Sequence, residues 1–311
     1  MAVQMTKPLL KKLCKDTGLY GTPSVNDKLY LHYKGFRTIE NLEEYTGVKA
    51  IWLEGNGLPK IEGLQNMTLL RSLYIHENMI ERIEGLDTAV DLDTINLSKN
   101  FIKKIENLSQ CTKLSTLTLA HNALTTAASV EHVLEIPSLQ TLDIQSNKID
   151  DIGVLDIFSQ MADLRVLYLM GNPVVKKIPH YRKTIISKCQ HLRYLDDRPV
   201  FDEERRRVNA WAAAFETGGL EAAQEAEREE LRSIRREKDE ADERNFRAFE
   251  QMIRQGQAIR QQREEQETRD GTFFPRPGAS EFNPFSGERI VDVPEDDSLR
   301  MAREARWGAG I

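Results

Sequence analysis

Long apolar segments and paired cysteines are missing from this 311-residue sequence. No apolar run approaches the roughly 18 residues that a membrane-spanning helix needs. The first residues, MAVQMTK, lack the apolar core of about 7–15 residues that a secretory signal carries. Three cysteines, Cys14, Cys111 and Cys189, lie too far apart for a disulfide framework or a paired metal motif. We therefore expect a soluble, cytoplasmic protein that does not associate with membranes.

Catalytic motifs are missing as well. The six histidines show no spacing typical of metal ligands, and the sequence has neither a phosphate-binding G-x-x-x-x-G-K-[ST] loop nor a G-x-S-x-G nucleophile motif. The formal net charge is −6, with the acidic excess after residue 200, which argues against general binding to nucleic acid. The sequence therefore predicts a non-enzymatic protein with no cofactor, no metal, no small-molecule substrate and no nucleic-acid partner.

An internal repeat is the strongest feature that is present. The frame LxxLxLxxN recurs along the chain, and its asparagines lie first 22 and then 25 residues apart: Asn56, Asn78, Asn100, Asn122, Asn147 and Asn172. A degenerate first copy has Lys34 in place of the asparagine. This pattern is typical of a leucine-rich-repeat solenoid, in which stacked repeats share one core. The predicted fold is α/β, with about six to seven repeats, parallel strands on the concave face and 3₁₀ or short helical returns on the convex face.

The repeated asparagines are expected to be structural. A tight turn leaves backbone N–H and C=O groups without partners, and a side-chain amide carries both donors and an acceptor. We therefore predict that each asparagine of the ladder points into its turn and bonds to the backbone there.

Strand residues that point away from the core form the candidate binding surface. Because the leucines of the frame point inward, the residues between them alternate onto the concave face. In the first three repeats they form an aromatic column and a second column beside it: Tyr30, Trp52 and Tyr74, then His32, Glu54 and His76. Grouped aromatic residues are typical of protein-binding hot spots. We predict a partner-binding site here; the alternative is that residues 8–20 fold over these side chains.

Segments on either side of the repeats differ in composition. Residues 1–27 are expected to cap the first repeat, residues 28–174 to form the repeats, and residues 175–215 to cap the last repeat. Residues 216–270 predict a charged helix, either solvated on its own or paired as a coiled coil. Residues 271–311 are rich in proline, glycine and acidic residues and predict a disordered tail.

Three stretches resemble the axonemal dynein assembly factor 1 family of leucine-rich-repeat ciliary proteins. They are IENLEEYTG at 39–47, LYLMGNPV at 167–174 and YLDDRPVF at 194–201. The resemblance implies a non-enzymatic binding scaffold that acts in the cytoplasm to preassemble axonemal dynein arms, and hence serves the motility and architecture of the cilium or flagellum. It also implies that the partners are axonemal dynein chains, chaperones or other assembly factors, and that the protein is located in the cytoplasm and the cilium.

Two other classes share a repeat of this length. A regulatory subunit of phosphatase-1 would be expected to have more repeats and no long charged extension. A leucine-rich spliceosomal subunit would be shorter and would work beside an RNA-binding partner. Both remain alternatives on the sequence, as adaptors of other complexes.

Overall fold

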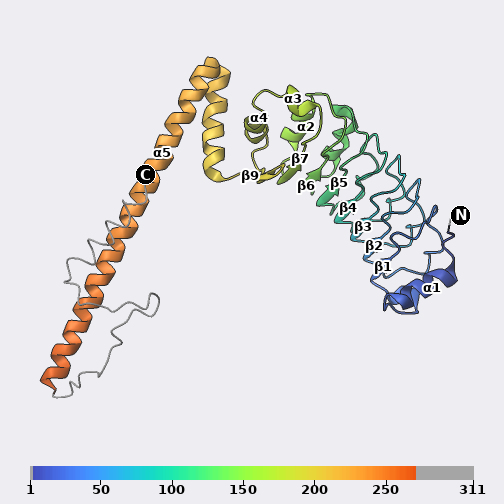
Figure 1. The fold of residues 1–311 in the computed structure, drawn as a ribbon, viewed down its shortest axis with the longest axis horizontal. Helices are drawn as coiled ribbons and strands as arrows, with labels where there is room; N and C mark the ends of the chain where they lie inside the picture. Colours follow the sequence, from blue (N-terminus) through green and yellow to red (C-terminus); the bar gives the residue numbers. More distant parts are fainter. Residues whose placement is uncertain (1–2, 271–311) are drawn as a thin grey trace. The chain divides into compact units, whose positions relative to one another are not determined.

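Residues 3–270 are described by the computed structural model, and their strands form one continuous sheet (Figure 1). Nine strands follow one another across the sheet in chain order: β1 Lys28–Tyr30, β2 Ala50–Trp52, β3 Ser72–Tyr74, β4 Thr94–Asn96, β5 Thr116–Thr118, β6 Thr141–Asp143, β7 Val166–Tyr168, β8 Tyr194–Leu195 and β9 Arg198–Pro199. Strands β1 to β8 pair in parallel, and β9 turns back antiparallel to β8. The predicted leucine-rich-repeat solenoid is confirmed.

Each three-residue strand directs one side chain into the core. The middle residue is buried and its two neighbours are half-buried in β2 to β7. Pairing keeps equivalent positions side by side, so that Leu29, Ile51 and Leu73 are stacked in successive repeats. One repeat cannot cover its own apolar residues, so the core forms only when repeats stack. A single apolar core accordingly runs from the N-terminal helix to the C-terminal cap.

The length of a repeat decides whether its return segment is a turn or a helix. In the 22-residue repeats the returns are turns with 3₁₀-type bonds, as from Tyr45 N–H to Leu42 O and from Val48 N–H to Tyr45 O. The two longer repeats add helical segments: η2 Ala127–Ser129 and η3 Glu131–Glu135 before β6, and α2 Val154–Gln160 before β7. The additional residues of these repeats supply the length that a helical turn requires.

The N-terminal segment packs on the first repeat and leaves the concave face open. Helix α1 (Lys7–Asp16) contacts β1 and buries Leu10 and Cys14. A short 3₁₀ turn, η1 (Pro23–Val25), follows it. The outward-facing side chains of β2 and β3, on the concave face, remain half-exposed. Residues 8–20 therefore do not cover the aromatic column, contrary to the alternative considered from the sequence.

The C-terminal cap closes the other end of the stack. Helices α3 (Val174–Lys177) and α4 (Tyr181–Lys188) follow β7, and α4 buries Ile185 and Ile186 against the last repeat. Cys189 is buried behind α4, and burial raises the pKa of its thiol to about 12, so this thiol is a packing group rather than a reactive one. Asp196, the residue after β8, ties the cap to the last repeat: one carboxylate oxygen accepts bonds from two backbone N–H groups of that repeat, and the other accepts from the Tyr181 hydroxyl at 2.9 Å.

The charged helix begins earlier than the sequence indicated, and the chain reverses within it. Helix α5 spans Asp202–Arg269, whereas we placed its start at residue 216. At Gly219 the backbone leaves the helical region (φ 72°, ψ −162°), and the chain turns back so that Glu230 lies 2.8 Å from Arg206 (Figure 1). The first arm of this reversal packs on the cap, where Trp211 is buried. The helix begins as early as residue 202 because the apolar side chains of this arm pack against the cap.

The contacts divide the chain into two compact units, residues 1–236 and 237–311. The second unit contains the remainder of α5, from residue 237 to Arg269. The predicted disordered tail, 271–311, lies outside the described residues. Within the described part of the chain, no helix is long and apolar enough to cross a bilayer.

Candidate functional site

The aromatic column forms a continuous stack on the concave face of the first three repeats. The ring centroids of Tyr30 and Trp52 are 4.8 Å apart, and those of Trp52 and Tyr74 are 5.3 Å apart with nearly parallel planes. The distances follow from the spacing of adjacent strands, which is about 4.8 Å. All three side chains are half-buried. We call Tyr30, Trp52 and Tyr74 the aromatic ladder; it presents rigid apolar edges on one surface.

The ladder ends after the third repeat. The same column continues with Asn96, Thr118 and Asp143, and an aromatic residue returns only at Tyr168. The Tyr168 ring lies 5.9 Å from that of Tyr194 in the cap. The apolar part of the concave face is therefore concentrated at the N-terminal end of the solenoid.

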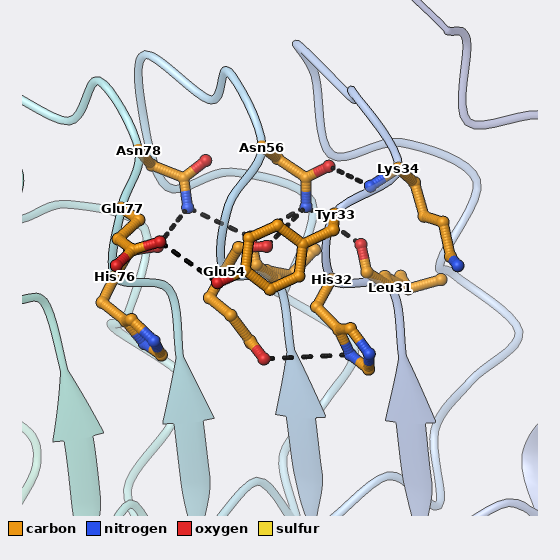
Figure 2. A network of polar contacts seen from close by, with 10 residues as sticks. Leu31, His32, Tyr33, Lys34, Glu54, Asn56, His76, Glu77 and Asn78 are labelled. Carbon is orange, nitrogen blue, oxygen red and sulfur yellow. Dashed lines mark hydrogen bonds and ion pairs between the residues drawn. The ribbon is translucent and has the colours of Figure 1, made fainter.

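A second column lies beside the ladder, two residues further along the chain and just past the end of each strand. His32, Glu54 and His76 occupy equivalent places in three neighbouring repeats, and Figure 2 shows Glu54 between the two imidazoles. The His32 Nδ1 atom lies 3.8 Å from a carboxylate oxygen of Glu54. The Glu54 side chain is only 12% exposed, and no lysine or arginine is paired with it in the described chain. We call these three residues the His–Glu–His row.

Tyr33 is a part of this surface that sequence reasoning missed. Its hydroxyl donates to Glu77 at 3.1 Å, and Lys99 donates to the other oxygen of the same carboxylate at 2.6 Å. The hydrogen bond from Lys99 holds the pKa of Glu77 below its usual value, and the bond to Glu77 raises the pKa of Tyr33. The ring of Tyr33 thereby reaches from the first repeat to the third, as Figure 2 shows.

Gly55 makes room for this ring. Its φ is +65°, and a Cβ atom built there would lie 2.0 Å from the Tyr33 ring. The equivalent residues Glu77 and Lys99 also have a positive φ, because the residue before each asparagine of the ladder closes the turn. The signal in the sequence was the glycine at a position where the next three repeats carry long side chains.

We expect Gly55→Ala to displace the Tyr33 ring and lower the melting temperature. Gly18→Ala is the matched control, since Gly18 has φ +73° but nothing within 4 Å of the added Cβ. Both substitutions incur left-handed backbone strain of about 1–2 kcal/mol, and only Gly55→Ala also meets a ring. Thermal denaturation should therefore show the larger loss for Gly55→Ala, and the added change Tyr33→Ala should remove the difference. Equal losses in the two single variants would contradict this account.

The asparagine ladder lies inside the turns and connects adjacent repeats. Asn100 accepts a hydrogen bond from Ile80 N–H at 3.1 Å and donates to Ile75 O and Leu97 O at 3.1 and 3.0 Å. The same three bonds recur at each of the other full rungs: Asn78, Asn122, Asn147 and Asn172. Asn56, the first rung, makes the same three bonds, with Phe36 N–H, Leu31 O and Leu53 O, and its oxygen also accepts from Lys34 N–H at 3.0 Å. Each amide thus satisfies backbone groups of two repeats at once.

Within residues 3–270, no three His, Cys, Asp or Glu side chains are grouped so that they could hold a metal ion. The concave face carries a stack of rings and an adjoining row of polar groups, with the sheet beneath both.

Several known proteins are similar to this chain in sequence. A family model described as "Leucine-rich repeat" matches residues 87–225. The chain is 54% identical over 263 residues to "Leucine-rich repeat-containing protein ODA7" of Chlamydomonas reinhardtii, covering 85% of this chain and 59% of that protein. It is 54% identical over 301 residues to "Dynein axonemal assembly factor 1" of Homo sapiens, covering 97% of this chain and 40% of that protein. The protein of the same name from Mus musculus is 64% identical over 226 residues, which are 73% of this chain and 35% of that protein.

Among solved structures, an internalin (inlF) from Listeria monocytogenes superposes with a TM-score of 0.50 at 21% identity, over 64% of this chain and 52% of that chain. This likeness concerns the fold alone. The chain spans less than two thirds of the length of the curated relatives named above. These relatives give no support to the phosphatase-1 and spliceosomal alternatives. The resemblance inferred from the sequence is confirmed: the chain is a leucine-rich-repeat protein and a homologue of the dynein axonemal assembly factor 1 proteins.

Proposed function

We propose that this chain is a non-enzymatic scaffold in the cytoplasmic preassembly of axonemal dynein arms, and that it acts by binding other proteins on its concave face. The observation that carries the proposal is the identity of 54% and 64% to two proteins named "Dynein axonemal assembly factor 1". On this proposal the partners are axonemal dynein chains, chaperones or other assembly factors. The chain works in the cytoplasm, and its effect is seen in the cilium or flagellum.

The shape of the repeat region supports a scaffold. A solenoid offers an extended rigid surface whose residues are fixed by the core beneath them. The aromatic ladder is the part of that surface with the composition of a hot spot, since tyrosine and tryptophan contribute most to binding energy when a partner covers them. We therefore place the docking surface at Tyr30, Trp52 and Tyr74, with the His–Glu–His row at its margin.

Removing the protein from cells that build motile cilia tests this role. We expect axonemes that lack dynein arms, and we expect dynein chains among the proteins that mass spectrometry identifies after co-purification from the cytoplasm. Intact arms after complete removal would refute the proposal. Recovery of phosphatase-1 or spliceosomal subunits in place of dynein chains would favour the alternatives.

A further inference from the structure

The His–Glu–His row contains a carboxylate, that of Glu54, with which no lysine or arginine is paired among residues 3–270. The Glu54 side chain is 12% exposed, which is less than the carboxylates that the structure pairs with a base. Glu204, 22% exposed, is held by Arg182 at 2.7 Å, and Glu227, 24% exposed, by Lys183. A desolvated carboxylate is costly without a cationic partner. Glu54 has only the imidazole of His32, at 3.8 Å.

Hydrogen bonding in the row is incomplete in the same place. Among the described residues, three buried side-chain atoms lack a hydrogen-bond partner: His32 Nδ1, Glu54 Oε2 and His76 Nδ1. Buried polar atoms are satisfied in the great majority of cases, so three such atoms in one row require an explanation. With its proton on Nε2, each imidazole presents Nδ1 as an acceptor. In this tautomer the three unpartnered atoms are all acceptors, and none of them has a donor.

Within residues 3–270, no lysine or arginine forms an ion pair with this row. The column continues as Ser98, Ala120, Gln145 and Met170, without lysine or arginine. Lys99, in the loop beyond it, is already bonded to Glu77 at 2.6 Å. The His32 side chain beside Glu54 is 39% exposed. A rotation of this ring would give a group from outside access to the carboxylate.

We infer that the His–Glu–His row receives the guanidinium group of an arginine from a protein partner. A guanidinium has five N–H donors and no acceptor, which complements a row of acceptors. Two residues away along the strands lies the aromatic ladder, where the methylene stem of the arginine or an adjoining apolar residue of the partner can rest. The inference rests on the proposed function, because it specifies what the docking surface recognises.

Two peptides that differ only in charge test the inference. The full chain is titrated with acetyl-Leu-Arg-Leu-amide and with acetyl-Leu-citrulline-Leu-amide, while NMR follows the histidine imidazoles in protein labelled with ¹³C-histidine. Citrulline has nearly the shape of arginine but is neutral. We expect saturable shifts at His32 and His76 with the arginine peptide, and at least about tenfold weaker binding of the citrulline peptide. Equal binding of the two peptides, or no binding of either, would overturn the inference.

The variant Glu54→Gln separates recognition from structure. We expect it to weaken binding of the arginine peptide about tenfold, and to leave the melting temperature equal or higher, since it removes an unpaired, largely buried charge. Glu77→Gln is the control: it removes one negative charge from the neighbouring loop, but Glu77 is already bonded to Lys99 and Tyr33, so binding should change less than twofold. A lower melting temperature for Glu54→Gln, or unchanged peptide affinity, would mean that Glu54 supports the fold and not a partner.

Failure of this inference can be told apart from failure of the proposed function. If dynein arms depend on the protein but the arginine peptide does not bind, only the arginine subsite is wrong. If the peptide binds through Glu54 but dynein arms form without the protein, the subsite stands and the role in arm assembly is wrong.

Discussion

Cells that carry Trp52→Ala together with Tyr74→Ala are expected to contain normal amounts of this protein and yet to build axonemes with missing dynein arms. Neither ring belongs to the inward leucine set, and both are half-exposed on the concave face. Truncation should therefore leave the core intact and remove only the stacking between the rings, worth about 1 kcal/mol. If the rings are hot spots, each truncation costs about 2 kcal/mol or more of partner affinity.

The control for this double variant lies in the same column. Tyr168→Ala removes a ring from an equivalent strand position four repeats further on, where it contacts Tyr194 and not the ladder. We expect normal arms in cells with this variant. Western blotting and electron microscopy of axonemes would give the protein level and the arm count. Reduced protein in the double variant would assign the two rings to folding, and normal protein with full arms would remove the ladder from the mechanism.

Most of the repeat region followed from the sequence because a single period determines it. Once the frame LxxLxLxxN is recognised, the inward leucines, the turn asparagines and the outward columns all have fixed places, and the stacking of Trp52 on Tyr74 follows from strand spacing. Tyr33 lies outside the strand frame, and its position depends on the missing side chain of Gly55 in the next repeat. A contact of this kind is not periodic, so the repeat pattern could not predict it.

The start of the charged helix is a second feature that the sequence did not predict correctly. Composition distinguishes the charged segment from the solenoid, but it does not show at which residue an amphipathic helix begins to pack against the cap. The arm from Asp202 packs Trp211 beside His180 of the cap, with ring centroids 5.1 Å apart, and Phe215 of the same arm stacks on Trp211 at 4.8 Å. The reversal at Gly219 then brings Glu227 to Lys183. The signal for this boundary in the sequence was a tryptophan followed by a pair of glycines. The overall charge pattern, from which the boundary was predicted, does not depend on those residues.

The asparagine ladder should respond to substitution across more than one repeat. Asn100→Ala leaves Ile80 N–H, Ile75 O and Leu97 O without their side-chain partners inside the solenoid. We expect a loss of about 1–3 kcal/mol in the free energy of unfolding, because buried polar groups that lose a partner retain their desolvation cost. Asn66→Ala, at an exposed asparagine that bonds only to Glu43 O at 3.3 Å, is the control, and its effect should stay within about 0.5 kcal/mol.

Hydrogen exchange would show how far the damage from Asn100→Ala extends. Stability in a solenoid is approximately a sum of repeat terms and interface terms, and the Asn100 amide lies in the interface between two repeats. Protection should therefore fall on both sides of the substitution, in β3 and β5 as well as in β4, while the cap around α4 exchanges as before. Asn100→Asp distinguishes the two roles of the amide: it keeps the acceptor for Ile80 N–H but loses the donor and places negative charge against two carbonyl oxygens. We expect it to be at least as destabilising as alanine. Unchanged protection between residues 70 and 125 in both variants would show that the asparagine does not hold adjacent repeats together.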